Sequence, residues 1–290
     1  MRAAWDRFFF AERSATPLSV FRIAFGIHLV YYLVSIGWFL ELYHGDGGML
    51  ARGAATGLAG AKWSLGSFAP SFAARYGLTL AAALCLALGL FTRVAAVAVW
   101  VLLSSWLNPL GPGTNAGDMI VRATAFLVMV AGVCGHLHRT HSLDALMFRR
   151  DARFENDRIT SWTTRLLQIQ IVLIYFFSGF TKAGSVDWTQ GVAMHYVFGQ
   201  TVWQRLDMSW AAASVIPVAA ATFGSLLFEL VVFPVLVWPR ATRVPVLVAG
   251  VLFHVAIGLT VRILVFTELM PVLYLCFLEQ EHYDRLEALW

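Results

Sequence analysis

The sequence is poor in charged residues. Only 13% of its 290 residues are Asp, Glu, Lys or Arg, whereas 59% are hydrophobic and the mean hydropathy is +0.70. A water-soluble domain of this length needs a more polar surface, so a soluble globular protein is excluded and most of the chain is expected to face lipid. The net charge of +4 comes without a clustered basic face, which excludes nucleic-acid binding.

Cysteine is also scarce. The three cysteines, Cys85, Cys134 and Cys276, lie inside apolar runs. A disulfide framework or a zinc site needs a characteristic spacing of ligands, which these residues lack. We therefore expect buried packing cysteines and no metal. A cleavable signal peptide is not expected either, because the first apolar run is too long and has no small-residue cleavage pattern.

The apolar residues are grouped into long runs. A helix needs about 20 apolar residues to cross the hydrocarbon core of a bilayer. The runs predict an all-α, polytopic integral membrane helical bundle of about eight transmembrane helices, forming a single domain over residues 1–290. The predicted spans are Leu18–Leu40, Tyr76–Phe91, Val94–Leu110, Met119–Cys134, Leu166–Thr181, Ala211–Val237, Val244–Leu264 and Val265–Glu279.

The distribution of basic residues predicts the orientation. With eight spans and both termini in the cytoplasm, 13 of the 21 Lys and Arg residues fall in inner segments, many of them in the 135–165 connection, and six fall outside. This bias agrees with the positive-inside rule. Arg22, near the inner end of the first span, is expected to snorkel to the headgroups. The outer connections are glycine-rich at 41–75 and rich in interfacial aromatic residues at 185–210.

Several ionisable residues lie inside the predicted spans, where burial in lipid is costly and a functional site or structural ion pair is the default interpretation. Asp118 and Arg122 are spaced i, i+4 and are expected to form a structural ion pair. His28 is interpreted first as a hydrogen-bonded core residue. Glu229 and His254 fall at similar depth on consecutive spans, as a hydrogen-bonded structural pair or as a proton relay.

Lys182, one of only two lysines, ends an apolar span. Arginine anchors a span at the interface as well as lysine does, so the choice of lysine suggests a group that can lose its proton. Burial favours the neutral amine, which can act as a general base. An interfacial anchor is the alternative interpretation of this lysine.

The residues around Lys182 form a recognisable series. It runs Gln168-x-x-Ile171, Tyr175-Phe176-x-x-Gly179-x-x-Lys182, then Asp187-Trp188-x-x-Gly191-x-Ala193-x-x-Tyr196. The series resembles the membrane core of vitamin K-dependent γ-carboxylase, and more closely its bacterial relatives, the HTTM (horizontally transferred transmembrane) domain family. Weaker support comes from Phe21-Arg22 with Gly26, from Asn115-x-Gly117-Asp118 with Arg122, from Ser142-Leu143-Asp144 and from Phe253-His254.

The resemblance implies a function. It suggests an enzyme of the bacterial inner membrane that uses a quinol of the vitamin K or menaquinol type, in an outward-facing pocket, to modify a peptide or lipid-linked substrate. Lys182 would be the base, assisted by His254 and Glu229. The pocket that binds the quinol is expected to include Gln168, Tyr175, Trp188 and His28.

Two other functions remain open. One is a non-redox accessory factor for maturation or export of a small secreted peptide toxin, as known for some small HTTM proteins. The other is a quinone-reactive respiratory subunit similar to the DoxX/DoxD family, which is typically shorter and has fewer spans. In each case membrane lipid is an expected partner, and a small secreted peptide is a further one.

Overall fold

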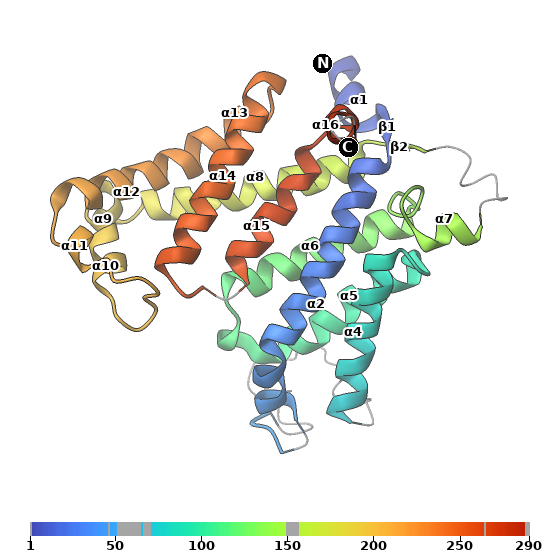
Figure 1. The fold of residues 1–290 in the computed structure, drawn as a ribbon, viewed down its shortest axis with the longest axis horizontal. Helices are drawn as coiled ribbons and strands as arrows, with labels where there is room; N and C mark the ends of the chain where they lie inside the picture. The colour runs from blue at the N-terminus through green and yellow to red at the C-terminus, as the bar shows by residue number, and fades with distance from the viewer. Residues whose placement is uncertain are drawn as a thin grey trace. The chain divides into compact units, whose positions relative to one another are not determined.

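The computed structural model describes residues 2–45, 47–50, 65, 71–148, 157–263 and 265–287. The chain divides into two compact units, which we call the N-terminal unit (Met1–Leu166 with Leu278–Trp290) and the C-terminal unit (Leu167–Phe277). Both are built from helices (Figure 1), which confirms the predicted all-α class. The prediction of a single domain over 1–290 stays a prediction.

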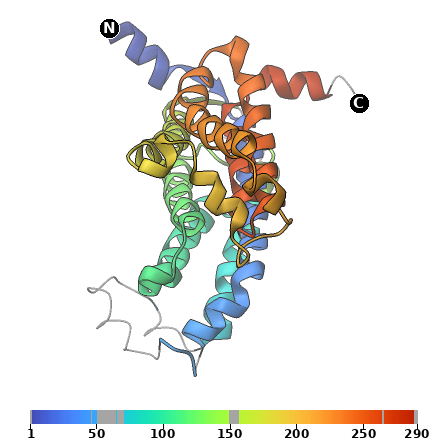
Figure 2. The ribbon, with the colours of Figure 1, turned by 90° about the vertical axis from the view of Figure 1, so that its left-hand side faces the viewer.

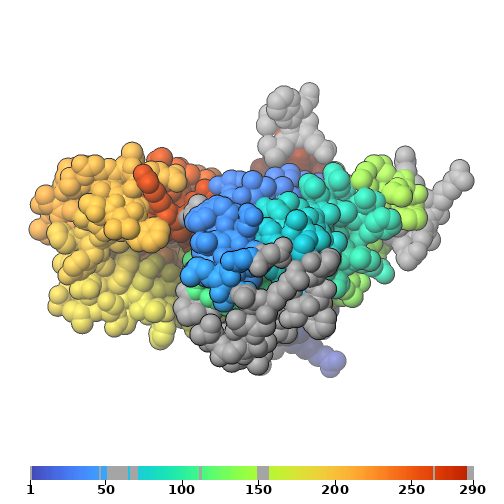
Figure 3. All heavy atoms as spheres, turned by 90° about the horizontal axis from the view of Figure 1, so that it is seen from below, coloured from blue at the N-terminus to red at the C-terminus, as the bar shows by residue number. Residues whose placement is uncertain are grey.

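The N-terminal unit contains most of the first half of the chain. Its helix α2 packs along α4, as the neighbouring spheres of the two helices show in Figure 3, and α5 packs against both α4 and α6. A short antiparallel ladder pairs β1 with β2, with Arg13 opposite Ile159. The elements are α1 (Arg2–Phe10), β1 (Glu12–Ser14), α2 (Thr16–His44), α4 (Phe72–Leu88), α5 (Thr92–Leu107), the 3-10 helix η1 (Asn108–Gly113), α6 (Ala116–Val133), α7 (Leu143–Met147), β2 (Arg158–Thr160), the start of α8 (Trp162–Ala183) and α16 (Gln280–Glu287).

The C-terminal unit contains the rest of α8 and the helices that follow it as far as Phe277 (Figure 2). Helix α14 packs against α15. The 185–210 connection, expected to be an aromatic interfacial segment, forms short helices. The elements are α9 (Val186–Thr189), α10 (Ala193–Gly199), α11 (Ser209–Ala212), α12 (Val215–Leu227), the π-helix η3 (Phe228–Val232), α13 (Phe233–Leu236), α14 (Arg240–Thr260), α15 (Phe266–Tyr274) and the 3-10 helix η4 (Leu275–Phe277).

Each of the eight predicted spans overlaps a helix or several consecutive helices. Six are long and apolar enough to cross a membrane, whereas Phe72–Leu88 and Phe266–Phe277 are shorter apolar helices. The count of eight is therefore not confirmed, because a helix rises only about 1.5 Å per residue and the two shorter helices fall below the usual length. Most of the glycine-rich 41–75 connection, including Lys62, lies outside the described residues, as do Arg149, Arg150 and Arg153.

Local sequence explains where the helices of the N-terminal unit begin and end. The hydroxyl of Ser71 accepts a hydrogen bond from the N–H of Ala74 at the start of α4, and Gly89, with φ of 68°, ends that helix in the left-handed conformation. Gly26 allows the close approach of α2 to α4, because a Cβ atom there would lie 2.6 Å from the backbone of Ala87.

The position of Arg22 in the sequence suggested that it snorkels to the headgroups, but the structure shows otherwise. Its side chain is fully buried. The guanidinium donates hydrogen bonds to four backbone carbonyls, those of Leu86, Ala87, Leu137 and His141, with three of the distances between 2.6 and 3.0 Å and the one to Leu86 at 2.5 Å. The last carbonyls of a helix lack hydrogen-bond donors within the helix and carry partial negative charge. The Arg22 guanidinium at the end of α4 supplies both the donors and the opposite charge.

Asp144 has the complementary role at the start of α5. Its carboxylate accepts hydrogen bonds from the backbone N–H groups of Phe91 (2.7 Å) and Thr92 (2.8 Å). It also lies within electrostatic range of Arg22. One buried cation and one buried anion thus close the end of α4 and the start of α5, and we call this arrangement the Arg22–Asp144 junction.

Candidate functional site

The C-terminal unit contains one strong ion pair. Nζ of Lys182, in the last turn of α8, lies 2.5 and 2.6 Å from the two carboxylate oxygens of Glu229, in η3. Nζ also donates to the hydroxyl of Ser178 at 3.2 Å and lies 5.1 Å from the centre of the Trp188 ring. The Lys182 side chain is 27% exposed and that of Glu229 only 6%. The pair therefore has one accessible member and one buried member.

Two backbone features bring the pair together. A Cβ atom on Gly179 would lie 2.8 Å from Cγ of Leu230 and 3.0 Å from Cβ of Glu229, so only glycine permits this approach of α8 to η3. Glu229 itself lies in a π-turn between two α-helical segments. Such turns are rare and are frequent at functional sites.

A second polar group in the same unit consists of Tyr175, His254 and Tyr274, from α8, α14 and α15. The Tyr175 hydroxyl is hydrogen-bonded to Nε2 of His254 at 2.7 Å and also to the Tyr274 hydroxyl. All three side chains are buried, and Phe233 packs on the Tyr175 ring with centroids 4.1 Å apart. This group, which we call the tyrosine–histidine cluster, therefore has fixed geometry.

The cluster is electrostatically linked to the ion pair and is left with one unsatisfied atom. His254 lies within electrostatic range of the Lys182 charge, and Tyr175 within range of Glu229. Nδ1 of His254 is buried and has no hydrogen-bond partner among the described residues. A buried polar atom without a partner costs about 1–3 kcal/mol, so a ligand oxygen or a water beside Nδ1 would be stabilising.

The three residues predicted to be catalytic, Lys182, Glu229 and His254, all lie in the C-terminal unit. Glu229 is paired with Lys182, whereas His254 is hydrogen-bonded to Tyr175. Of the two interpretations of Glu229 and His254, the direct hydrogen-bonded pair is not found among the described residues, and the proton relay stays a prediction.

Among the residues predicted to bind the quinol, Tyr175 and Trp188 lie in these two groups. Gln168 instead donates its amide N–H to the Cys276 carbonyl at 2.7 Å, which fastens α8 to η4. His28 belongs to the N-terminal unit. It was expected to be a hydrogen-bonded core residue, and it is buried, but its Nε2 has no hydrogen-bond partner among the described residues.

Asp118 and Arg122 do not form the expected ion pair in the part of the chain that the structure describes. Asp118 accepts hydrogen bonds from the Tyr32 hydroxyl at 2.7 Å and from the N–H of Asn115 at 2.8 Å, the second as half of a capping box at the start of α6. Arg122 donates to the side-chain carbonyl of Asn108 at 2.7 Å. The helix terminus and Tyr32 together satisfy the carboxylate, so it does not need the arginine.

Tyr274 is the residue of the cluster that the sequence analysis missed. The available signal was its position: tyrosines of membrane proteins gather at the headgroup level, whereas Tyr274 lies inside the last apolar run. A hydroxyl at that depth needs a buried partner.

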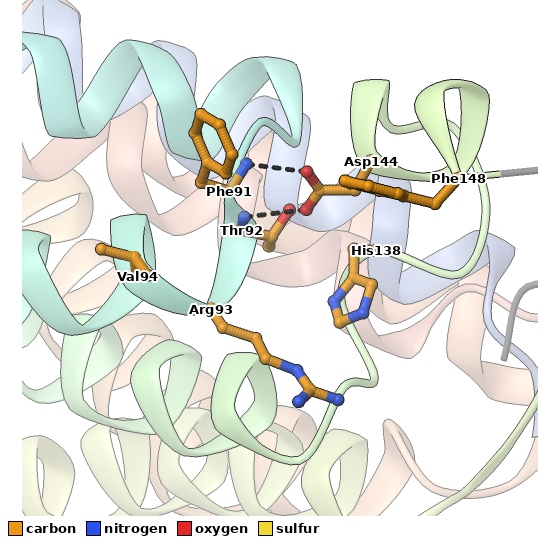
Figure 4. Close-up of a pocket in the computed structure, with 7 residues that line it drawn as sticks. All are labelled: Phe91, Thr92, Arg93, Val94, His138, Asp144 and Phe148. Carbon is orange, nitrogen blue, oxygen red and sulfur yellow. Dashed lines mark hydrogen bonds between the residues drawn. The ribbon is translucent and has the colours of Figure 1, made fainter. Parts of the chain in front are cut away.

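The N-terminal unit contains a cavity of about 240 Å³ at the start of α5 (Figure 4). None of the residues of the ion pair or of the tyrosine–histidine cluster lines it. Among the described residues, no group of three or more His, Cys, Asp or Glu side chains could hold a metal ion.

The six long apolar helices of the described residues define a polytopic α-helical integral membrane protein. The HTTM domain matches residues 10–282, nearly the whole chain, and the chain belongs to this family. It is thereby related to the membrane core of γ-carboxylase, as the series from Gln168 to Tyr196 indicated. No curated protein and no solved structure matches the chain.

Proposed function

We propose that this protein is a membrane-embedded, quinol-dependent enzyme with chemistry similar to that of γ-carboxylase, and that the Lys182–Glu229 pair is its proton acceptor. The observation that carries the proposal is the ion pair itself, in which the lysine is partly accessible and the carboxylate is buried. The proposal includes the bacterial inner membrane as location, an outward-facing site, and a peptide or lipid-linked substrate.

The geometry of the pair supports a role in proton transfer. With Nζ 2.5–2.6 Å from both carboxylate oxygens, a proton can pass between the two groups without movement of heavier atoms. When Glu229 holds the proton, Lys182 is a neutral amine and can accept another from a bound hydroxyl. The Trp188 face beside Nζ stabilises the charged lysine that results.

The tyrosine–histidine cluster supplies the proposed polar contact for a quinol oxygen. The unsatisfied Nδ1 of His254 suits a hydroxyl or carbonyl oxygen, and Phe253 and Phe266 stand 5.6 and 5.2 Å from the histidine ring. Tyr175 fixes the orientation of His254 through its Nε2. A bound quinol of the vitamin K or menaquinol type would supply the oxidisable aromatic ring, and Gln168 contributes by holding α8 in place.

The experiment is a titration of purified protein in detergent with menaquinol and with vitamin K hydroquinone. Lys182→Ala and His254→Ala remove the proposed base and the proposed contact. His195→Ala is the matched control, because His195 is an exposed histidine of the same unit. We expect saturable binding that weakens at least tenfold in the first two variants and is unchanged in the control.

Absence of saturable binding to either quinol would overturn the proposal. Equal binding by the wild type and by Lys182→Ala and His254→Ala would also contradict it, because the quinol would then bind elsewhere. The accessory role in maturation of a secreted peptide would become the working hypothesis.

A further inference from the structure

The cavity in the N-terminal unit lies where a membrane-spanning helix begins. Its lining comes from the first turn of α5, from the segment after α6 and from the residues in and after α7 (Figure 4). Helix α5 and the η1 residues that continue it, through Leu110, form one of the six candidate spans. The start of such a span lies at the level of the lipid headgroups. The lining residues are Phe91, Thr92, Arg93, Val94, His138, Asp144 and Phe148.

The charge that this cavity offers to a ligand is positive. The Asp144 carboxylate is already bound by the N–H groups of Phe91 and Thr92 and lies within electrostatic range of Arg22. Arg93 is exposed, and among the described residues no ion pair joins it to a carboxylate. Its charge is felt by His138 on the neighbouring segment. The cavity therefore offers an unneutralised guanidinium, which suits a phosphate oxygen.

The rim of the same cavity is apolar and open. Phe91 is 59% exposed, Val94 70% and Phe148 47%. A soluble anion gains nothing from such a rim, whereas the first carbons of an acyl chain would be removed from water by it. An exposed guanidinium beside exposed hydrocarbon side chains on the same cavity matches the two parts of a phospholipid, its phosphate and its acyl chains.

We propose that this cavity is a binding site for the headgroup of an anionic phospholipid, with Arg93 contacting the phosphate and Phe91, Val94 and Phe148 contacting the upper acyl chains. The proposal is independent of the quinol chemistry, since none of its residues belongs to the ion pair or to the tyrosine–histidine cluster. The sequence of the 135–165 connection is rich in arginine, which would add a general attraction for an anionic leaflet.

The test measures lipid retention by the full-length protein with native mass spectrometry. Delipidated protein in a non-ionic detergent is titrated with phosphatidylglycerol and, separately, with phosphatidylcholine of the same acyl chains. Arg93→Gln removes the phosphate contact, and Val94→Trp fills the cavity without changing charge. Arg285→Gln is the matched control, because it removes an exposed arginine of the same unit that does not line the cavity.

We expect phosphatidylglycerol to bind saturably and at least fivefold more tightly than phosphatidylcholine. Arg93→Gln and Val94→Trp should each weaken that binding at least fivefold, and Arg285→Gln should leave it unchanged. Equal retention of the two lipids, or an equal loss with Arg285→Gln, would overturn the proposal. Competition by free glycerol 3-phosphate at concentrations comparable to those of the lipid would also overturn it, because the occupant would then be a soluble phosphate.

Discussion

Each unit of the chain has a cation at a helix end, Arg22 beside the end of α4 and Lys182 in the last turn of α8. The two cations differ in their partners. Arg22, in the N-terminal unit, donates to four backbone carbonyls. Lys182, in the C-terminal unit, is paired with the carboxylate of Glu229. A carbonyl cannot take up a proton near neutral pH, whereas a carboxylate can. The first arrangement therefore stabilises the fold only, and the second can also exchange a proton.

The largest effect is expected from Arg22→Gln, which removes the charge and leaves buried carbonyls without donors. We expect a loss of about 3 kcal/mol or more in the free energy of unfolding, measured by thermal or denaturant unfolding in detergent. Arg22→Lys should recover only part of it, because one ammonium group cannot reproduce the planar fork of the guanidinium. Wild-type stability in Arg22→Gln would show that the junction is not structural.

A smaller effect is expected from Gly179→Ala. The new methyl group would meet Leu230 and Glu229, so α8 and η3 must separate, with a cost of about 1–3 kcal/mol and weakened quinol binding. Gly224→Ala is the control, because a Cβ atom there meets nothing within 4 Å. Its unfolding temperature should stay unchanged or rise slightly. Equal effects of the two substitutions would contradict the role given to Gly179.

The N-terminal unit should also be sensitive to acid. Burial, and then the charges of Arg93, Arg139 and Arg22 against the opposing effect of Asp144, lower the pKa of His138 from its ordinary value of 6.5 to about 4. The stability that this neutral histidine contributes is present above pH 6.5. It is lost as the pH falls toward 4, because the unfolded chain binds the proton first.

The check on His138 is the unfolding temperature between pH 7.5 and pH 4.5. It should fall less steeply in His138→Gln than in the wild type. Identical pH profiles for the two proteins would show that His138 does not contribute to the acid sensitivity.

The smallest effect on stability is expected from replacing the whole ion pair, Lys182→Met with Glu229→Gln. Neutral groups of similar volume often replace a buried pair without loss of stability. The unfolding temperature should therefore stay close to that of the wild type, while quinol binding falls at least tenfold. A large loss of stability would mean that the pair is a structural element like Arg22, and the contrast between the two cations would disappear.

Much of the fold could be predicted from hydrophobic runs alone, since each predicted span overlaps one or more of the helices. The positions of Arg22 and Asp118 show the limit of that approach. Depth in a span suggested snorkelling for Arg22, but its partners are carbonyls at the end of another helix, which only packing brings within reach. The partners of Asp118 are a helix start and Tyr32, although the Asn115-x-x-Asp118 spacing of a capping box could be read from the sequence.

All members of the candidate site except Tyr274 could be named from the sequence, but their pairing could not. Lys182, Glu229, His254 and Tyr175 were all predicted individually. The contact between Lys182 and Glu229 depends on a π-turn. A π-turn adds only one residue to a helix, and a hydrophobic run does not show where that residue is inserted. From the sequence alone, a lysine at the end of an apolar helix can be either a general base or an interfacial anchor. The ion pair with Glu229 becomes visible only in the structure.

The π-turn at Phe228–Val232 determines which single-residue deletion this span can tolerate. A π-turn holds one residue more than the α-turn it replaces, and α12 and α13 adjoin this one directly. Deleting one residue elsewhere in this span would rotate everything beyond it by about 100°. We expect that deleting Val231 would instead convert the π-turn to regular α-helix, so that the bundle still folds while Glu229 turns away from Lys182.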